Sequence, residues 1–216
     1  MNRKFHMLAV DIAFNAMPVE YRKKFLAGFS FDMLLETADI PYVPNRFGEQ
    51  EDLHLDHSFK LYLKGRDLHK IGEGNALEEL VQFSKSVVEL YKQDNPQLVR
   101  YNIAKGTHYV IDIGTYPHVN EATWDKYHTK FEDLAGSWLD LHKHLVEELV
   151  KNYRPEPMRS VHNRSRAIAE DAYFASADYL PTLKRGGIIT DLQWVTVCTK
   201  HIYAVMDWFS TFESCL

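Results

Sequence analysis

The sequence is poor in cysteine, with only Cys198 and Cys215 among 216 residues. Two isolated cysteines cannot build a disulfide-rich scaffold, and they exclude a four-cysteine metal site within one chain. Long apolar runs are also missing, since no stretch approaches the roughly 18–20 residues that span a bilayer. We therefore expect no transmembrane segment.

An excess of positive charge is missing as well. The formal net charge is −5 at neutral pH, so duplex nucleic acid is not an expected partner. The N-terminus starts with basic residues, but Asp11 interrupts the apolar run that follows, and no cleavage pattern is convincing. In the absence of a secretion signal, the sequence predicts a cytoplasmic protein. It leaves the oligomeric state open.

What the sequence does contain is apolar residues at helical spacing. Hydrophobic residues make up 45% of the chain, enough for one substantial core. No repeat or low-complexity linker divides the chain, so we expect a single domain over residues 1–216. Strand signals are weak, and the predicted fold class is all-α. Prolines and glycines separate the expected helices, which cover 4–17, 19–37, 75–93, 96–112, 121–152, 157–180 and 189–212.

The strongest chemical signal is a pair of matching motifs. His108 and Asp112 are separated by three residues, and His128 and Glu132 repeat this spacing. On a helix, residues four apart lie on the same face, one turn apart. His118 lies between the two pairs, just after a turn, so a helix–turn–helix hairpin could bring all five side chains to one end of a bundle. Imidazoles and carboxylates in such an arrangement are typical ligands of zinc and similar divalent ions.

An ordinary alternative exists for each pair. A histidine and an acid four residues apart often form a surface ion pair, and Asp140 with His144 offers an example elsewhere in the chain. Two such pairs that flank a Pro-His turn are harder to explain in this way. From spacing alone, a metal site and a set of ion pairs stay open.

The same stretch resembles a known family. Residues 108–118 read HYVIDIGTYPH, and residues 128–132 read HTKFE. This pattern is similar to the zinc-dependent phospholipases C of bacteria and to the fungal single-strand-specific nucleases, which share one fold and one site. The resemblance implies a single-domain helical bundle of the phospholipase C and nuclease type. It also implies a multinuclear metal centre, whose ligands come from a helix–turn–helix.

Two further segments extend the resemblance. His6 lies near the start of the first expected helix, where the family carries a zinc-binding histidine; on its own, His6 would be a half-buried helix residue. His57 lies in the segment LDHSF, which resembles the family's segment with another zinc-binding histidine; on its own, His57 would be an exposed loop residue. The last 60 or so residues fit the family's helical length but carry no matching motif.

The resemblance implies how these residues share two or three Zn2+ ions, although other divalent metals fit as well. The ligands of one ion would be His118, His128 and Glu132. His57 and His108 would hold a second ion, and Asp112 would bridge it to a third, which His6 helps to hold. In the family the N-terminal residue completes the third site. Met1 lies only five residues before His6, so a centre with two metals stays open.

One departure concerns catalysis. The family usually has a zinc-binding aspartate about twelve residues before the position of His57, and this aspartate has been assigned a role in activating water. Here Asn45 occupies that place. An asparagine can offer a carbonyl oxygen to a metal but cannot accept a proton. Glu51 or Asp52 could substitute, so the candidate catalytic residues are Asn45, Asp52 and Asp112.

These observations favour a zinc-dependent hydrolase that cleaves a phosphoester, either phospholipid-like or a small phosphodiester, with water activated by the metal. The main alternative is a metal-dependent enzyme of small-molecule biosynthesis, such as a hydrolase, cyclase or dehydratase. A purely structural metal site is less favoured, because such sites are usually rich in cysteine.

Two other groups of residues have both a functional and a structural interpretation. Aromatic residues near the motif could line a substrate cleft, but core packing explains them better: Tyr109, Tyr116, Trp124 and Tyr127. Four arginines could meet a phosphate-bearing ligand, but an ordinary solvated helix start explains them better: Arg154, Arg159, Arg164 and Arg166. Nuclease action is accordingly the weaker form of the hypothesis.

Overall fold

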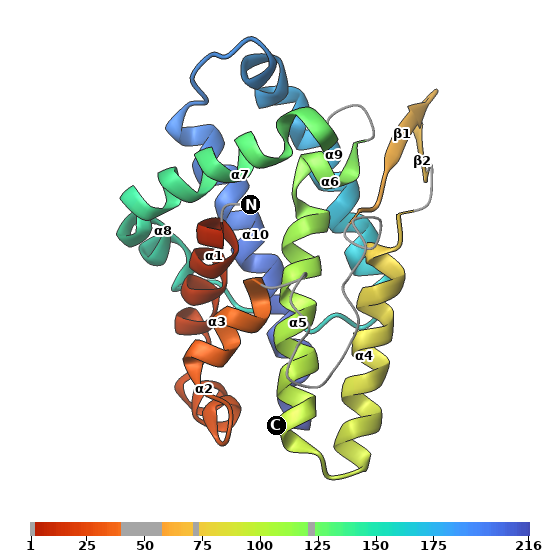
Figure 1. Cartoon of the computed structure of the whole chain (residues 1–216), viewed down its shortest axis with the longest axis vertical. Coiled ribbons are helices and arrows are strands. Elements are labelled where there is room, and N and C mark those ends of the chain that lie inside the picture. The colour runs from red at the N-terminus through yellow and green to blue at the C-terminus, as the bar shows by residue number, and fades with distance from the viewer. Residues whose placement is uncertain (1–2, 40–57, 71–73, 121–123) are drawn as a thin grey trace.

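The computed structural model describes residues 3–39, 58–70, 74–120 and 124–216. Within these ranges the chain forms ten α-helices and one small sheet (Figure 1), which confirms the predicted all-α class. The helices are α1 (Arg3–Ala16), α2 (Val19–Leu26), α3 (Phe31–Asp39), α4 (Ala76–Lys92), α5 (Pro96–Gly114), α6 (Tyr116–Val119), α7 (Trp124–Leu141), α8 (Lys143–Val150), α9 (Val161–Lys184) and α10 (Asp191–Thr211).

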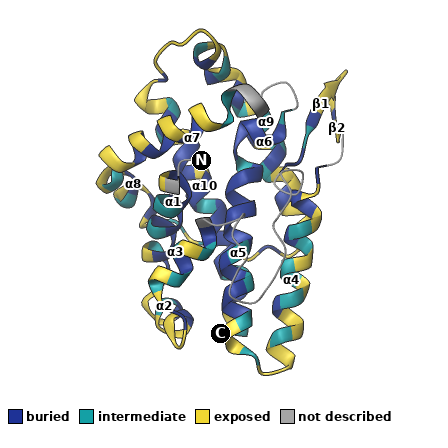
Figure 2. Cartoon of the chain, viewed as in Figure 1, coloured by how far each residue is buried: buried dark blue, intermediate teal, exposed yellow. Residues whose placement is uncertain are grey.

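Helices α5 and α10 form the centre of the bundle. Both are apolar along most of their length, and both are largely buried (Figure 2). Helix α5 packs against α4, α3 and α10, while α1 packs against α10 and α7. Helix α7 crosses one end of the bundle, above α1 and α5 in Figure 1. This arrangement places the start of α1, the last turns of α5 and the start of α7 near one another.

Two of the expected helices are divided in the structure. The segment 19–37 forms α2 and α3, because Gly28 adopts φ +92° and ends the first helix. The Ser30 hydroxyl then accepts a hydrogen bond from the Met33 backbone N–H at 3.1 Å and so caps α3. The segment 121–152 divides at His142. The ring Nδ1 of His142 donates a hydrogen bond to the Trp138 carbonyl at 2.9 Å, and the imidazole ring stacks on the Trp138 ring.

The last long helices begin at capping residues. Helix α9 starts at Val161 rather than near 157, since the Ser160 side chain accepts from the Asn163 N–H at 3.3 Å. Helix α10 starts after Thr190, which forms a capping box with Gln193.

A small antiparallel hairpin is the main element that the sequence did not predict. It pairs β1 (Leu61–Lys64) with β2 (Asp67–Lys70), and the two-residue turn between them contains Gly65 at φ +69°. The hairpin is attached to α6, because Leu61 forms an isolated parallel bridge with Asn120.

None of the described helices has both the length and the apolar character needed to cross a membrane. The single-domain organisation over residues 1–216 and the cytoplasmic location stay predictions.

Candidate metal centre

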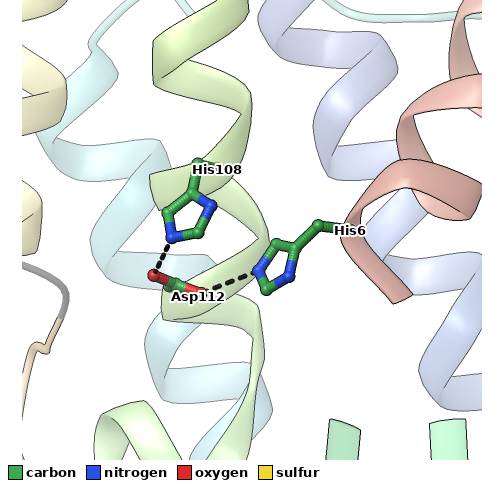
Figure 3. Close-up of side chains that lie close together, drawn as sticks. All are labelled: His6, His108 and Asp112. Atoms are coloured by element: carbon green, nitrogen blue, oxygen red, sulfur yellow. Dashed lines mark hydrogen bonds and ion pairs between the residues drawn. The ribbon is translucent and has the colours of Figure 1, made fainter. Parts of the chain in front are cut away.

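The first group of candidate ligands is built on α5 and α1. His108 and Asp112 lie one turn apart on α5, as their spacing predicts, and His108 Nε2 is 3.0 Å from Asp112 Oδ2. Helix α1 contributes His6, whose Nε2 is 2.9 Å from Asp112 Oδ1. The rings of His6 and His108 stack with centroids 4.5 Å apart. Figure 3 shows both imidazoles turned toward the one carboxylate. We call His6, His108 and Asp112 the Asp112 group.

The second group comes from α6 and α7. His128 and Glu132 lie one turn apart on α7, with His128 Nε2 2.8 Å from Glu132 Oε1. His118, on the single turn of α6, places its Nε2 3.5 Å from the same oxygen. We call His118, His128 and Glu132 the Glu132 group. His118 Nε2 also lies 3.4 Å from Asp112 Oδ1, so the two groups are adjacent.

The six side chains are almost fully enclosed, apart from the partly exposed His128. In each group, one ligand atom from each residue lies within 4.8 Å of the others. Within the described ranges, these are the two sets of three or more histidines, cysteines and acids with such geometry. The hairpin predicted between 108 and 132 therefore brings its five side chains together, and His6 joins them from a distant part of the chain.

The geometry of the Glu132 group fits a cation. The Nε2 atoms of His118 and His128 face each other at 2.8 Å. Because two unprotonated imidazole nitrogens repel at this distance, a proton or a cation must lie between them. Glu132 Oε2 is buried and has no hydrogen-bond partner among the described residues. A buried carboxylate oxygen without a partner is costly, and coordination of a metal would satisfy it.

The Asp112 group fits a cation for a different reason. His108 Nδ1 lies 2.8 Å from the backbone carbonyl of Ala38, on α3, so this nitrogen must carry the proton and donate it. In the neutral ring the lone pair is then on Nε2, which points to Asp112. Metal-binding histidines are commonly oriented by this kind of hydrogen bond from the second nitrogen.

The charges of these residues differ between the groups. Burial lowers the pKa of His108, but the charge and hydrogen bond of Asp112 outweigh it and raise the pKa to about 9. Burial lowers the pKa of His118 to about 4, against the opposing effect of Asp112. Burial also acts to raise the pKa of Glu132, but hydrogen bonds from His118 and His128 outweigh it and lower this pKa well below its usual range. At neutral pH, His108 is therefore protonated and His118 is neutral.

This difference predicts the pH dependence of zinc binding. His108 must lose its proton before Nε2 can bind a metal, so the affinity of the Asp112 group should rise about tenfold per pH unit between about pH 7 and pH 9. His118 is already neutral across that range, so it adds no such dependence to the Glu132 group. Calorimetric zinc titrations at several pH values should separate a pH-dependent site from a flatter one. Two sites with equal slopes would contradict this assignment.

The remaining sequence candidates lie outside the described residues: Asn45, Glu51, Asp52 and His57. The described residues that follow them are close to the Glu132 group. Ser58 and Phe59 are buried, and the Phe59 N–H donates to the carbonyl of His118 at 3.0 Å. Lys60 Nζ donates to the carbonyl of Pro117 at 3.0 Å. The start of the hairpin segment thus helps to hold α6 in place.

Asp140 and His144, which have the same spacing as the motif pairs, do not form a pair with each other in the structure. Lys4 Nζ binds Asp140 at 2.7 Å, and the fully exposed His144 lies 3.1 Å from Glu147. The aromatic residues follow the structural interpretation where their side chains are described, since Tyr109 and Tyr116 are buried in the core and Tyr127 packs against it.

One buried histidine near the centre was not anticipated. His201, on α10, lies edge-on to Phe5 with ring centroids 5.3 Å apart. Its Nδ1 donates to the Val197 carbonyl at 2.6 Å, and its Nε2 is 3.0 Å from the Thr115 hydroxyl. Both nitrogens are therefore used within the protein. No specific signal in the sequence pointed to it, because any histidine inside a helix has a carbonyl four residues earlier within reach.

Comparison with known proteins supports the fold. No protein-family model matches the sequence, and no curated protein matches it. A solved structure with a similar fold is that of the alpha-toxin of Clostridium perfringens, isolated from avian strain SWCP, with a TM-score of 0.57 and 16% sequence identity. The match covers 98% of this chain and 62% of the toxin chain, so the chain spans less than two thirds of that protein. The two proteins share a fold.

Proposed function

We propose that this protein is a metal-dependent hydrolase that cleaves a phosphoester, with zinc as its metal. The observation that carries the proposal is the convergence of six ligand side chains from four helices, all buried except His128, with nitrogen and oxygen atoms 2.8–3.5 Å apart. The sequence resemblance to zinc-dependent phospholipases C and the fold shared with alpha-toxin support the same function.

Each group would hold at least one metal ion in this proposal. The Glu132 group supplies two imidazoles and one carboxylate, which leaves coordination positions for water or substrate. In the Asp112 group, Asp112 Oδ2 faces His108 and Oδ1 faces His6. Two oxygens that face different ligands suit a carboxylate that bridges two ions, with His57 as a further ligand of the His108 ion. A centre of two or three ions fits this set of residues.

The residues of the chain orient and enclose the reaction. Divalent ions in such a centre, when bound, lower the pKa of water and neutralise charge on a phosphoryl group and its leaving oxygen. The buried ligands exclude bulk water from one side of the centre, and Ala38 fixes the ring of His108. Asp52 is the proposed proton acceptor for the attacking water. Asn45 can bind a metal through its carbonyl oxygen but cannot take the proton.

The test is hydrolysis of nitrophenyl phosphocholine by the protein after incubation with zinc. We expect nitrophenol release that a chelator abolishes and zinc restores, and that His118→Ala prevents. If the protein binds at least two equivalents of zinc but does not cleave phosphodiesters, the proposed reaction is wrong. The asparagine at position 45 would then favour the second candidate, a metal-dependent enzyme that acts on a small metabolite. A protein that binds no zinc at neutral pH would exclude both.

A further inference from the structure

A cavity of about 140 Å³ lies between α9 and α10, and none of the candidate metal ligands lines it. Its buried walls are mostly apolar and short, and they include Ala172, Val197 and Ala204. A cavity of roughly this volume with apolar walls can hold a benzene-sized group. The inner part of the cavity therefore suits a branched alkyl chain or a small ring.

The inner wall separates this cavity from the metal groups. Gly114 and His201 both line it, and the two nitrogens of His201 already bond to Val197 and Thr115. His201 therefore has no free hydrogen-bond donor for a ligand in the cavity and would contact such a ligand through its ring carbons. A ligand in the cavity would lie behind His201, with no contact to a metal.

The solvent side of the cavity is charged, with Arg164, Asp171 and Lys200 as its exposed ionic residues. Arg164 is already compensated, because its Nη2 is 2.9 Å from an oxygen of the fully buried Asp207. Asp207 also accepts a hydrogen bond from the Tyr153 hydroxyl, another lining residue, at 2.9 Å. Arg164 and Tyr153 thus form a side of the cavity that the buried Asp207 holds in place.

Asp171 and Lys200, the other charged residues on the solvent side of the cavity, are less closely paired than Arg164. Neither lies within ion-pair distance of an opposite charge in the described part of the chain, although the carboxylate of Asp171 is near enough to Arg164 to help raise the pKa of that guanidinium. The two residues come from different helices, α9 and α10. The rim therefore presents one carboxylate and one ammonium group around an apolar interior. A ligand with a single charge would satisfy only one of them.

We propose that this cavity binds a small zwitterion with an apolar side chain, of the class of the branched-chain α-amino acids. Its ammonium group pairs with Asp171, its carboxylate pairs with Lys200, and its side chain fills the space beside Ala172 and Ala204. The opposite charges of the rim match those of the ligand, and the volume matches the side chain. The proposal does not depend on the metal centre, so it can be tested on metal-free protein.

Three probes with nearly the same carbon skeleton test the charge requirement. They are L-leucine, 4-methylpentanoate, which lacks the amino group, and 3-methylbutylamine, which lacks the carboxylate. Titrations followed by NMR should give L-leucine an affinity about fivefold higher than that of either singly charged probe, the upper range for one exposed ion pair. No binding of L-leucine at millimolar concentration, or equal binding of the three probes, would overturn the proposal.

Charge variants then assign each contact. Lys200→Gln should reduce the affinity for L-leucine about fivefold and leave the affinity for 3-methylbutylamine unchanged. Asp171→Asn should also reduce the affinity for L-leucine about fivefold, but it should leave the affinity for 4-methylpentanoate unchanged. Lys184→Gln and Asp178→Asn are matched controls, since both residues are exposed on α9 and neither lines the cavity. Ala204→Leu fills the cavity and should abolish binding of all three probes. If the control variants weaken L-leucine binding as much as the rim variants do, the cavity is not the site.

Discussion

Asp112→Asn should remove metal from the Asp112 group, where this carboxylate would be shared by two ions, whereas His128→Ala should remove only the ion of the Glu132 group. The carboxylate of Asp112 faces His6 and His118 with Oδ1 and His108 with Oδ2. An amide has no negative charge and only one oxygen to offer, so it cannot serve as a shared ligand. His128, by contrast, has contacts with Glu132 and His118 in its own group.

The expected loss is large. Removal of a group that merely orients a metal ligand typically costs 10–100-fold in affinity, so loss of a ligand should cost at least about 100-fold. Metal analysis after zinc incubation and desalting should find about one equivalent fewer in His128→Ala than in the parent protein. Asp112→Asn should lose more than one equivalent, and hydrolysis of nitrophenyl phosphocholine should fall with it.

His144→Ala is the matched control for these variants. His144 is a fully exposed histidine that pairs with an acid three residues away on α8, at 3.1 Å, and it should keep the full metal content. Circular dichroism should show that all three variants are folded. If Asp112→Asn retains as much zinc as the parent protein, Asp112 is not a metal ligand, and the proposed centre is wrong.

The pairing of ligands within α5 and within α7 could be predicted from the sequence because it depends on local geometry. Four residues make about one helical turn, so His108 must lie near Asp112 once the helix forms. The convergence of the two pairs is less local, since it requires the turn at α6. The participation of His6 depends on packing between α1 and α5, which lie about a hundred residues apart. Spacing alone says nothing about that contact, and here the family resemblance supplied the prediction.

Other features were missed for reasons that are visible in the structure. The division at His142 involves no glycine or proline, and it accompanies the stacking of His142 on Trp138. The hairpin β1–β2 has few residues, so periodicity is a weak signal there, although the two-residue turn with Gly65 was a usable one. The cavity between α9 and α10 depends on short side chains that meet across two helices, and no single segment of the sequence reveals such a space.

Gly106→Ala should destabilise the protein strongly, although alanine is the better helix former. Gly106 lies on α5, half a turn before His108. A Cβ atom built there would overlap with Cζ2 of Trp208, on α10. Non-bonded carbons prefer separations of about 3.5–4.0 Å, so Trp208 or a helix would have to move.

Trp208 has little freedom to move. It is fully buried, and its indole N–H donates to the Ile103 carbonyl at 2.8 Å. Overpacking of a core typically costs about 1–3 kcal/mol, and a clash with a pinned indole belongs at the upper end. The gain from helix propensity is at most about 1 kcal/mol, so the net effect should be a loss of about 2 kcal/mol. For a chain of this size, that lowers Tm by about 4–8 °C.

Thermal and urea denaturation of metal-free protein would measure this effect apart from metal binding. Gly114→Ala is a graded control on the same helix, because its Cβ would be 3.1 Å from the nearest atom, in His201, and it should cost less. Trp208→Phe is expected to be destabilising by itself, yet it should cost less in the Gly106→Ala background, since the smaller ring makes room for the methyl group. If Gly106→Ala proves as stable as the parent protein, the close approach of α5 and α10, which positions His108 and Asp112 against the rest of the bundle, does not exist in solution.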